Sequence, residues 1–111
     1  MMKTNSIIIT LLMVSFFVFN ACKDDSSNDN TPPIINIIGD STIYVGKDSL
    51  YTDLGATATD EMDGDITSQI KVINPVNTSI TGNYQVKYNV SDKAGNAALE
   101  KIRVVNVMVL K

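Results

Sequence analysis

The chain has 111 residues, which is room for one folded domain and excludes a second. Its 9 basic and 12 acidic side chains give a net charge of −3, which argues against nucleic acid as a partner, because that affinity comes largely from Lys and Arg that neutralise phosphates. It has no His and one Cys, so catalytic triads, Cys–His pairs and ordinary zinc sites are excluded, and we expect no enzyme.

Residues 1–21 have the plan of a secretory signal peptide. Lys3 lies in a short positive start, an apolar run follows from Ile7 to Phe19, and the small Ala21 comes last. The run is 13 residues long, whereas a helix needs about 20 residues to span a bilayer, so a permanent transmembrane anchor is the weaker interpretation. Without Lys3 the mature chain would carry 8 basic and 12 acidic side chains, a net charge of 8 − 12 = −4.

Cys22 follows the leader directly and, as the only thiol, has no disulfide partner within the chain. With Ala21 before it, the stretch resembles the lipobox of bacterial lipoproteins, although Phe19 replaces the usual Leu and Asn20 is larger than the usual small residue. The resemblance implies that Cys22 is acylated, becomes the new N-terminus and holds the chain on a membrane. The alternative is an ordinary signal peptide followed by a free cysteine.

Lys23, Asp24 and Asp25 come next and are similar to the export signal that sends Bacteroidetes lipoproteins to the outer face of the outer membrane. This similarity implies a lipid-anchored, surface-exposed protein of the cell outer membrane. A periplasm-facing protein, in which these residues are only part of a polar tether, remains the alternative. Residues 23–33 lack side chains able to join a core, so we predict that residues 22–33 are the lipidated Cys22 and a disordered tether.

Residues 34–111 show short apolar or alternating runs separated by Gly, Asp and Asn, with no sustained helical repeat. This texture predicts an all-β chain that folds as a sandwich. The seven expected strands are Ile34–Ile38, Thr42–Val45, Asp48–Thr52, Ala56–Ala58, Ile70–Ile73, Asn83–Ser91 and Ala98–Val109.

The clearest alternation runs from Tyr84 to Ser91, where the even-numbered residues up to Val90 are apolar and predict one buried face. The following Asp92–Asn96 is typical of a hairpin loop. In the last strand both parities are apolar, so the pattern does not choose its inward face; that strand is either covered on both sides or contains a bulge.

Gly82-Asn83-Tyr84-Gln85-Val86 has the form of the tyrosine corner of immunoglobulin domains, with Val86 in place of the second cysteine. With it, several stretches resemble the bacterial surface immunoglobulin-like domains related to hyalin-type repeats, which also occur in an insecticidal crystal protein. These stretches are 33–39, 51–60, 63–67, 82–92 and 94–97. The resemblance implies a seven-stranded immunoglobulin-like β-sandwich without a disulfide, used as a non-catalytic module on surface adhesins and secreted polysaccharide-degrading enzymes, and implies no particular ligand.

Four carboxylates lie within the six residues 60–65, and clustered oxygen ligands suit calcium. The stretch is no EF-hand, because alignment on Gly64 puts Thr59 and Ile70 where that loop needs Asp and Glu. Cadherin-like sandwiches bind calcium at their ends through loop acids, and the hairpin loop could lie at the same pole. The calcium ligands predicted on this basis are Asp60, Asp63, Asp65, Asp92 and Asn96. The alternative is that these residues only shape turns.

Two other surface functions have weaker signals. The chain has no Trp, which argues against a carbohydrate platform, and leaves Tyr44 and Tyr51 as the tyrosines available to a glycan. Ser41 and Ser49 lie in Asp-Ser tripeptides that fit Bacteroidetes protein O-glycosylation, although both serines are also ordinary turn residues.

These observations predict a non-enzymatic, lipid-anchored cell-envelope protein that presents one immunoglobulin-like adhesion or interaction module. The partner would be an unknown protein or glycan, and calcium is the one cofactor considered. The alternative is an accessory subunit that captures or degrades glycans at the outer membrane.

Overall fold

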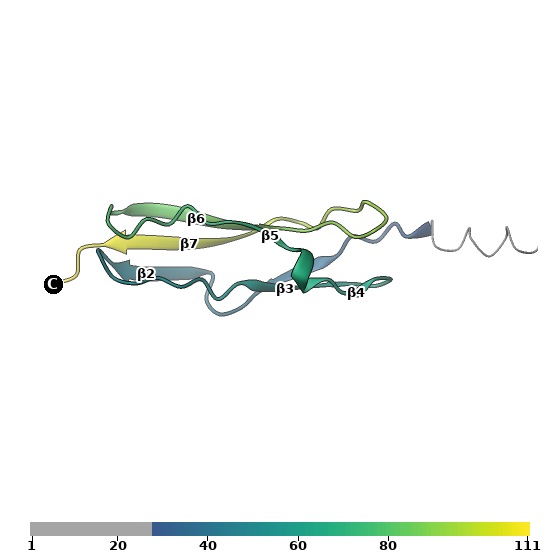
Figure 1. Ribbon diagram of the computed structural model, residues 1–111, viewed down its shortest axis with the longest axis horizontal. Helices are drawn as coiled ribbons and strands as arrows, with labels where there is room; N and C mark the ends of the chain where they lie inside the picture. The colour runs from purple at the N-terminus through teal and green to yellow at the C-terminus, as the bar shows by residue number, and fades with distance from the viewer. Residues whose placement is uncertain (1–27) are drawn as a thin grey trace, which may run out of the picture.

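A computed structural model describes residues 28–111 and shows an all-β domain (Figure 1). The one helix that lies wholly within the described residues is η2 (Thr67–Gln69), a single turn of 3-10 helix. No helix in this part of the chain is long and apolar enough to cross a membrane. The strands are β1 (Ile34–Ile37), β2 (Thr42–Gly46), β3 (Ala56–Asp60), β4 (Gly64–Asp65), β5 (Lys71–Ile73), β6 (Gly82–Asn89) and β7 (Lys101–Met108).

The strands form two sheets that pack as a sandwich, as predicted. One sheet has the order β1-β3-β4, and the other has the order β2-β7-β6-β5. All pairings are antiparallel except that of β2 with β7, which is parallel. The chain crosses between the sheets after β1, and the C-terminus lies at the opposite end of the sandwich from residue 28 (Figure 1).

Six of the predicted strands correspond to β1, β2, β3, β5, β6 and β7, but the predicted strand Asp48–Thr52 is wrong. Asp48 has a φ of 67°, in the left-handed region, and the Ser49 amide donates to the Gly46 carbonyl at 3.0 Å, so a turn replaces the strand. The pattern missed β4, which is two residues long and contains a glycine. An isolated bridge between Ser91 and Ala97 lies outside the named strands, and β7 begins at Lys101, later than the predicted Ala98.

The core confirms the alternation predicted for β6. Val86 and Tyr88 are fully buried, Val90 is nearly so, and all three pack with Ile35 and Ala58 from the other sheet. The loop after β6 is the predicted hairpin loop, closed by the bond from the Gly95 amide to the Asp92 carbonyl.

The inward face of β7 is the odd-numbered one. Arg103, Val105 and Val107 are buried, whereas Ile102 and Met108 on the other parity are exposed. Pairing with β6 continues without interruption from Lys101 to Val107, so there is no bulge in this part of the strand. The buried, odd-numbered positions include the charged Arg103, so in the sequence they are no more apolar than the even-numbered positions.

The tyrosine corner is present in the structure. The Tyr84 hydroxyl donates to the carbonyls of Asn77 at 3.0 Å and Ile80 at 2.7 Å, upstream on the same chain. These bonds hold the connection between β5 and β6 against the sandwich. Because the chain has only one cysteine, this domain depends on such contacts and on packing rather than on an internal disulfide.

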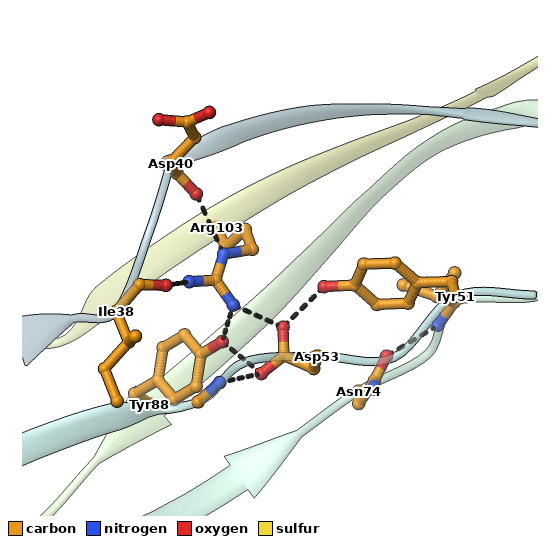
Figure 2. A network of polar contacts seen from close by, with 9 residues as sticks. Ile38, Asp40, Tyr51, Asp53, Asn74, Tyr88 and Arg103 are labelled. Carbon is orange, nitrogen blue, oxygen red and sulfur yellow. Dashed lines mark hydrogen bonds and ion pairs between the residues drawn. The ribbon is translucent and has the colours of Figure 1, made fainter.

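A buried polar network around Arg103 ties the two sheets together (Figure 2). Its guanidinium contacts the Asp53 carboxylate at 2.6 Å and the Tyr88 hydroxyl at 2.9 Å, and it donates to the carbonyls of Ile38 and Asp40. Arg103 belongs to β7, whereas Ile38 and Asp40 lie on the connection between β1 and β2. The network therefore fixes the point where the chain passes from one sheet to the other.

Candidate functional site

Three irregular segments meet at the pole of the sandwich where the described chain begins. They are residues 28–33, the turn between β3 and β4, and the loop between β6 and β7 (Figure 1). The antiparallel pairing of β1 with β3, which aligns Ile34 with Thr59, brings the residues before β1 beside the end of β3. Each of the three segments contributes an aspartate.

Asp29, Asp60 and Asp63 each place a carboxylate oxygen within 4.8 Å of the other two. Asp29 is 8% exposed and Asp60 is 6% exposed, while Asp63 is half-buried. We call these three residues with Asp92 the acidic pole. Carboxylates held this close and this dry repel one another unless a proton or a cation lies between them.

Asp60 is fixed by the turn that follows it. Its Oδ2 accepts hydrogen bonds from the amides of Met62 at 3.0 Å and Asp63 at 2.9 Å. Its Oδ1 is buried and has no hydrogen-bond partner among the residues that the structure describes. A buried carboxylate oxygen without a partner is rare and energetically costly, so it marks a place where a ligand is expected.

Asp63 and Asn96 connect the segments. The Asp63 Oδ2 accepts a hydrogen bond from the Lys93 amide at 2.8 Å, which joins the β3–β4 turn to the β6–β7 loop. The Asn96 side chain donates to the Asp29 carbonyl at 2.8 Å and to Asp92 Oδ2 at 2.9 Å. These bonds hold the pole together from three sides.

Asp92 lies beside the carboxylates of Asp29 and Asp60. Burial opposes its charge, but the hydrogen bonds from Asn96 prevail and lower the pKa of Asp92. The Thr31 amide favours the charged form of Asp29, yet burial and the charges of Asp60 and Asp92 outweigh it and raise the pKa of Asp29. Two neighbouring carboxylates therefore disfavour the charged form of Asp29.

Of the five predicted calcium ligands, Asp60 and Asp63 lie in one cluster with Asp29. Asp92 and Asn96 are bonded to each other, and the Asn96 side chain also donates to the Asp29 carbonyl. Asp65 is a correction: its exposed carboxylate accepts the Thr67 amide at 2.9 Å and so shapes the start of η2. Asp29 was missed because residues 22–33 read as a tether. In the structure Asp29 is instead buried, and its carbonyl accepts a hydrogen bond from Asn96 of the domain.

The position of Asp29 in the sequence, shortly before β1, could have indicated its place in the acidic pole. Asp29 lies just before Pro32-Pro33, which lead directly into β1. If β1 pairs with β3, the residue positions before β1 must lie beside Asp60. Strand pairing, rather than composition, was the information needed.

Of the remaining predicted residues, the structure describes some and not others. Cys22, Lys23, Asp24 and Asp25 lie outside the described residues. Ser41 and Ser49 are both exposed, so either hydroxyl is accessible, and their O-glycosylation stays a prediction.

The two tyrosines considered for glycan contact differ. The Tyr51 hydroxyl donates to Asp53 at 2.5 Å and its ring packs against the core, so Tyr51 belongs to the Arg103 network (Figure 2). Tyr44 is 69% exposed and stands on the outward side of β2. It lies in a row with Asn106 on β7 and Asn83 on β6, and these two amides are bonded at 2.7 Å.

This outward surface of the sheet β2-β7-β6-β5, which we call the outer face, also carries apolar side chains. Ile73, Lys87 and Ile102 form a second row, in which both isoleucines are exposed. Between the rows lies a groove of about 430 Å³. Its lining residues are Ile73, Pro75, Asn83, Tyr84, Gln85 and Lys87.

A two-sheet sandwich with a parallel β2–β7 pair and a tyrosine corner is typical of an immunoglobulin-like domain. The chain belongs to the family described as bacterial surface protein, Ig-like domain, which it matches over residues 35–107. The resemblance inferred from the sequence is thereby confirmed.

Similar proteins share this domain within longer chains. Pesticidal crystal protein Cry22Aa of Bacillus thuringiensis is 47% identical over 55 residues, which are 49% of this chain and 8% of that protein. Lipoprotein BT2262 of Bacteroides thetaiotaomicron has a similar structure, with a TM-score of 0.61 and 26% identity over 71% of this chain and 39% of that one.

A structure of CBM51-2 in complex with GlcNAc and INT domains from Clostridium perfringens ZmpB is also similar. Its TM-score is 0.54, with 32% identity over 70% of this chain and 17% of that one. The chain therefore spans less than half the length of each of these relatives.

Proposed function

We propose that this chain is a non-enzymatic lipoprotein of the bacterial outer membrane, anchored through Cys22, that presents its immunoglobulin-like domain to a protein partner at the cell surface. Membership of a bacterial surface family and the likeness to a Bacteroides lipoprotein support this proposal. Lys23, Asp24 and Asp25 would direct the anchored protein to the outer side of the membrane.

The observation that carries the proposed interaction role is the composition of the outer face. It combines an exposed tyrosine, two exposed isoleucines and a row of side-chain amides on one sheet. Aromatic side chains are enriched where proteins meet, and apolar side chains surrounded by polar groups suit such a contact. The outward side of the other sheet, by comparison, carries Asn36, Thr57 and Thr59 along with one isoleucine.

Anchoring and topology are testable in a Bacteroidetes host that expresses the full chain. We expect mass spectrometry to find an acylated N-terminal Cys22, and protease added to intact cells to digest the domain. A Cys22→Ser variant should leave the membrane fraction, and a variant with Asn at positions 23–25 should stay in the membrane but resist protease. A protein that resists protease without any substitution would contradict surface exposure.

Site-specific photo-crosslinking tests the outer face in the same cells. A photoreactive amino acid at position 44 should give a discrete protein adduct, whereas the same group at position 57, on the outward side of the other sheet, should not. Equal adducts from both positions, or none from position 44, would overturn the assignment of the partner to this face.

A second candidate function is glycan capture, favoured by the exposed Tyr44 beside Asn106 and Asn83. An aromatic ring with neighbouring amides can stack on a sugar and bond its hydroxyl groups. A glycan array probed with the full chain in detergent would support this function if binding is strong and is lost in Tyr44→Ala. Binding that persists in Tyr44→Ala would not come from this row.

A further inference from the structure

The acidic pole has a concentration of negative charge that the described protein does not neutralise. Two ion pairs occur among residues 28–111, Lys47 with Asp48 and Arg103 with Asp53, and neither includes a carboxylate of the pole. Asp29, Asp60 and Asp92 are each more than nine-tenths buried. Buried carboxylates are normally paired with a cation or a metal, so this pole lacks its counter-charge.

Asp60 supplies an independent indication that a ligand belongs there. While its Oδ2 is used by the turn, its Oδ1 is buried without a hydrogen-bond partner in the described chain. An oxygen that is needed only for the turn would be satisfied by an amide or exposed to water. The geometry leaves this oxygen for a cation that Asp29 and Asp63 can reach at the same time.

The donor set selects the kind of cation. All the ligand atoms are oxygens, and the chain has no His, which excludes the usual nitrogen ligands of zinc and copper. The ligands come from the segment before β1, the last residue of β3 and the turn that follows it, rather than from one continuous loop. Calcium accepts six to eight oxygens in flexible geometry, whereas magnesium demands a near-ideal octahedron. Calcium fits this arrangement better than magnesium does.

The site is also accessible. A depression of about 410 Å³ opens beside the cluster and is lined by Asp29, Met62, Asp63, Lys93 and Ala94. It provides an entry path and room for the water ligands that calcium commonly retains. Lys93 is the one basic side chain on its rim, and it forms no ion pair with the described residues.

We propose that Asp29, Asp60 and Asp63 bind one Ca²⁺ ion, which clamps residues 28–33 onto the pole of the sandwich. The ion would link residues 28–33, which follow the proposed lipid anchor, to the loops at this end of the domain. Bound calcium would thereby set the direction in which the domain leaves the membrane. Calcium binding does not depend on the partner proposed for the outer face, because the acidic pole lies outside that face. It can be tested on the purified chain.

The test is isothermal titration of CaCl₂ into the full chain, purified in detergent and stripped of metal with a chelator. We expect one ion per chain with a Kd at or below the range of about 10⁻⁴ to 10⁻³ M seen in extracellular modules. Asp60→Asn and Asp63→Asn should each weaken binding by about tenfold or more, since each removes a charged ligand. MgCl₂ should bind at least about tenfold more weakly.

The matched control is Asp65→Asn, which removes the same charge from the same stretch but from a carboxylate outside the cluster. It should keep the affinity of the unsubstituted chain. Equal losses in Asp65→Asn and Asp63→Asn would reduce the effect to general acidity and overturn the site, as would absence of heat at millimolar calcium or equal binding of magnesium.

Hydrogen exchange separates loss of the site from loss of the fold. Calcium should slow amide exchange in residues 28–31 by about tenfold, because binding suppresses local opening, while β6 should exchange equally slowly with and without the ion. Calcium-dependent heat without added protection of residues 28–31 would refute the clamp. Asp63 is half-buried, so Asp63→Asn is a variant that should fold even if Asp60→Asn does not.

Discussion

Arg103 Nη1 lies 2.6 Å from Asp53 Oδ1, and the arginine side chain is completely buried. The pair joins β7 to the segment before β3, and the hydroxyls of Tyr51 and Tyr88 donate to the same carboxylate. A charge inside a small domain is tolerated only where its partners are complete. The stability of the domain therefore depends strongly on the Asp53 carboxylate.

Asp53→Asn should destabilise the domain by about 3 kcal/mol or more, because it leaves the buried guanidinium without a counter-charge. That is a large part of the roughly 5–15 kcal/mol that stabilises a typical domain. Urea denaturation followed by circular dichroism measures the loss as a lower transition midpoint.

The matched control is Asp48→Asn. Asp48 also forms an ion pair, with Lys47 at 3.0 Å, but both side chains are exposed, and Asn tolerates the left-handed backbone at this position. We expect a change within about 0.5 kcal/mol. Equal losses in the two variants would show that burial of the Arg103 pair does not matter to stability.

Acid should remove the stability that Asp53 contributes. Burial disfavours its charge, but hydrogen bonds from Tyr51, Tyr88 and Arg103 and the arginine charge prevail and lower the pKa of Asp53. A carboxyl whose folded pKa is below the unfolded value of about 3.9 stabilises fully above that value, and the contribution is lost as the pH falls through it toward the folded pKa.

Urea midpoints between about pH 6 and pH 2.5 test this sign. The unsubstituted chain should lose stability steeply below about pH 4, whereas Asp53→Asn should start lower and decline less over the same interval. The other aspartates titrate in both proteins, so the difference between the two curves isolates Asp53. Parallel curves would contradict the prediction.

The sequence predicted best what depends on neighbouring residues. A half-buried strand repeats every two residues, so the alternation up to Val90 was enough to identify β6 and its buried side. The tyrosine corner was equally visible, since the Tyr84 hydroxyl bonds to Ile80 only four residues upstream. Local period and local motif were sufficient for both.

Features that depend on distant pairing were not predictable in this way. Asp53 and Arg103 are 50 residues apart, and nothing local marks either as buried. Asp48–Thr52 has the composition of a strand, but a left-handed residue turns the chain away from any partner. Asp29 belongs to the acidic pole only because β1 pairs with β3, which a polar segment does not announce.

Tyr84→Phe should cost about 1–2 kcal/mol, because it removes the hydroxyl whose one hydrogen is shared between two backbone carbonyls, while keeping the ring. Tyr44→Phe removes a hydroxyl from a ring that is 69% exposed, so it should change the free energy of unfolding by less than about 0.5 kcal/mol. Chemical denaturation of both variants measures the difference, and equal values would mean that the corner holds the β5–β6 connection through packing alone.

High pH should also destabilise the Arg103 network, because it ionises the tyrosines that bond to Asp53. Burial and the Asp53 carboxylate raise the pKa of Tyr51 to about 12 and also raise that of Tyr88, because both protonated phenols donate hydrogen bonds to Asp53. Their unfolded values are about 10. A group held neutral in the fold stabilises fully below the unfolded pKa, and this stability is lost as the pH rises through about 10 toward the folded values.

Phenolate absorbance at about 295 nm and pH 11 reports this directly. Of the four tyrosines in the chain, about two more should be ionised in urea than in the folded protein at that pH. In Tyr51→Phe the difference should fall by about one, since the Tyr51 phenol is missing while the fold still keeps Tyr88 protonated. Circular dichroism at pH 11 confirms that the folded sample is folded, and an unchanged difference in Tyr51→Phe would show that Asp53 does not hold the Tyr51 proton.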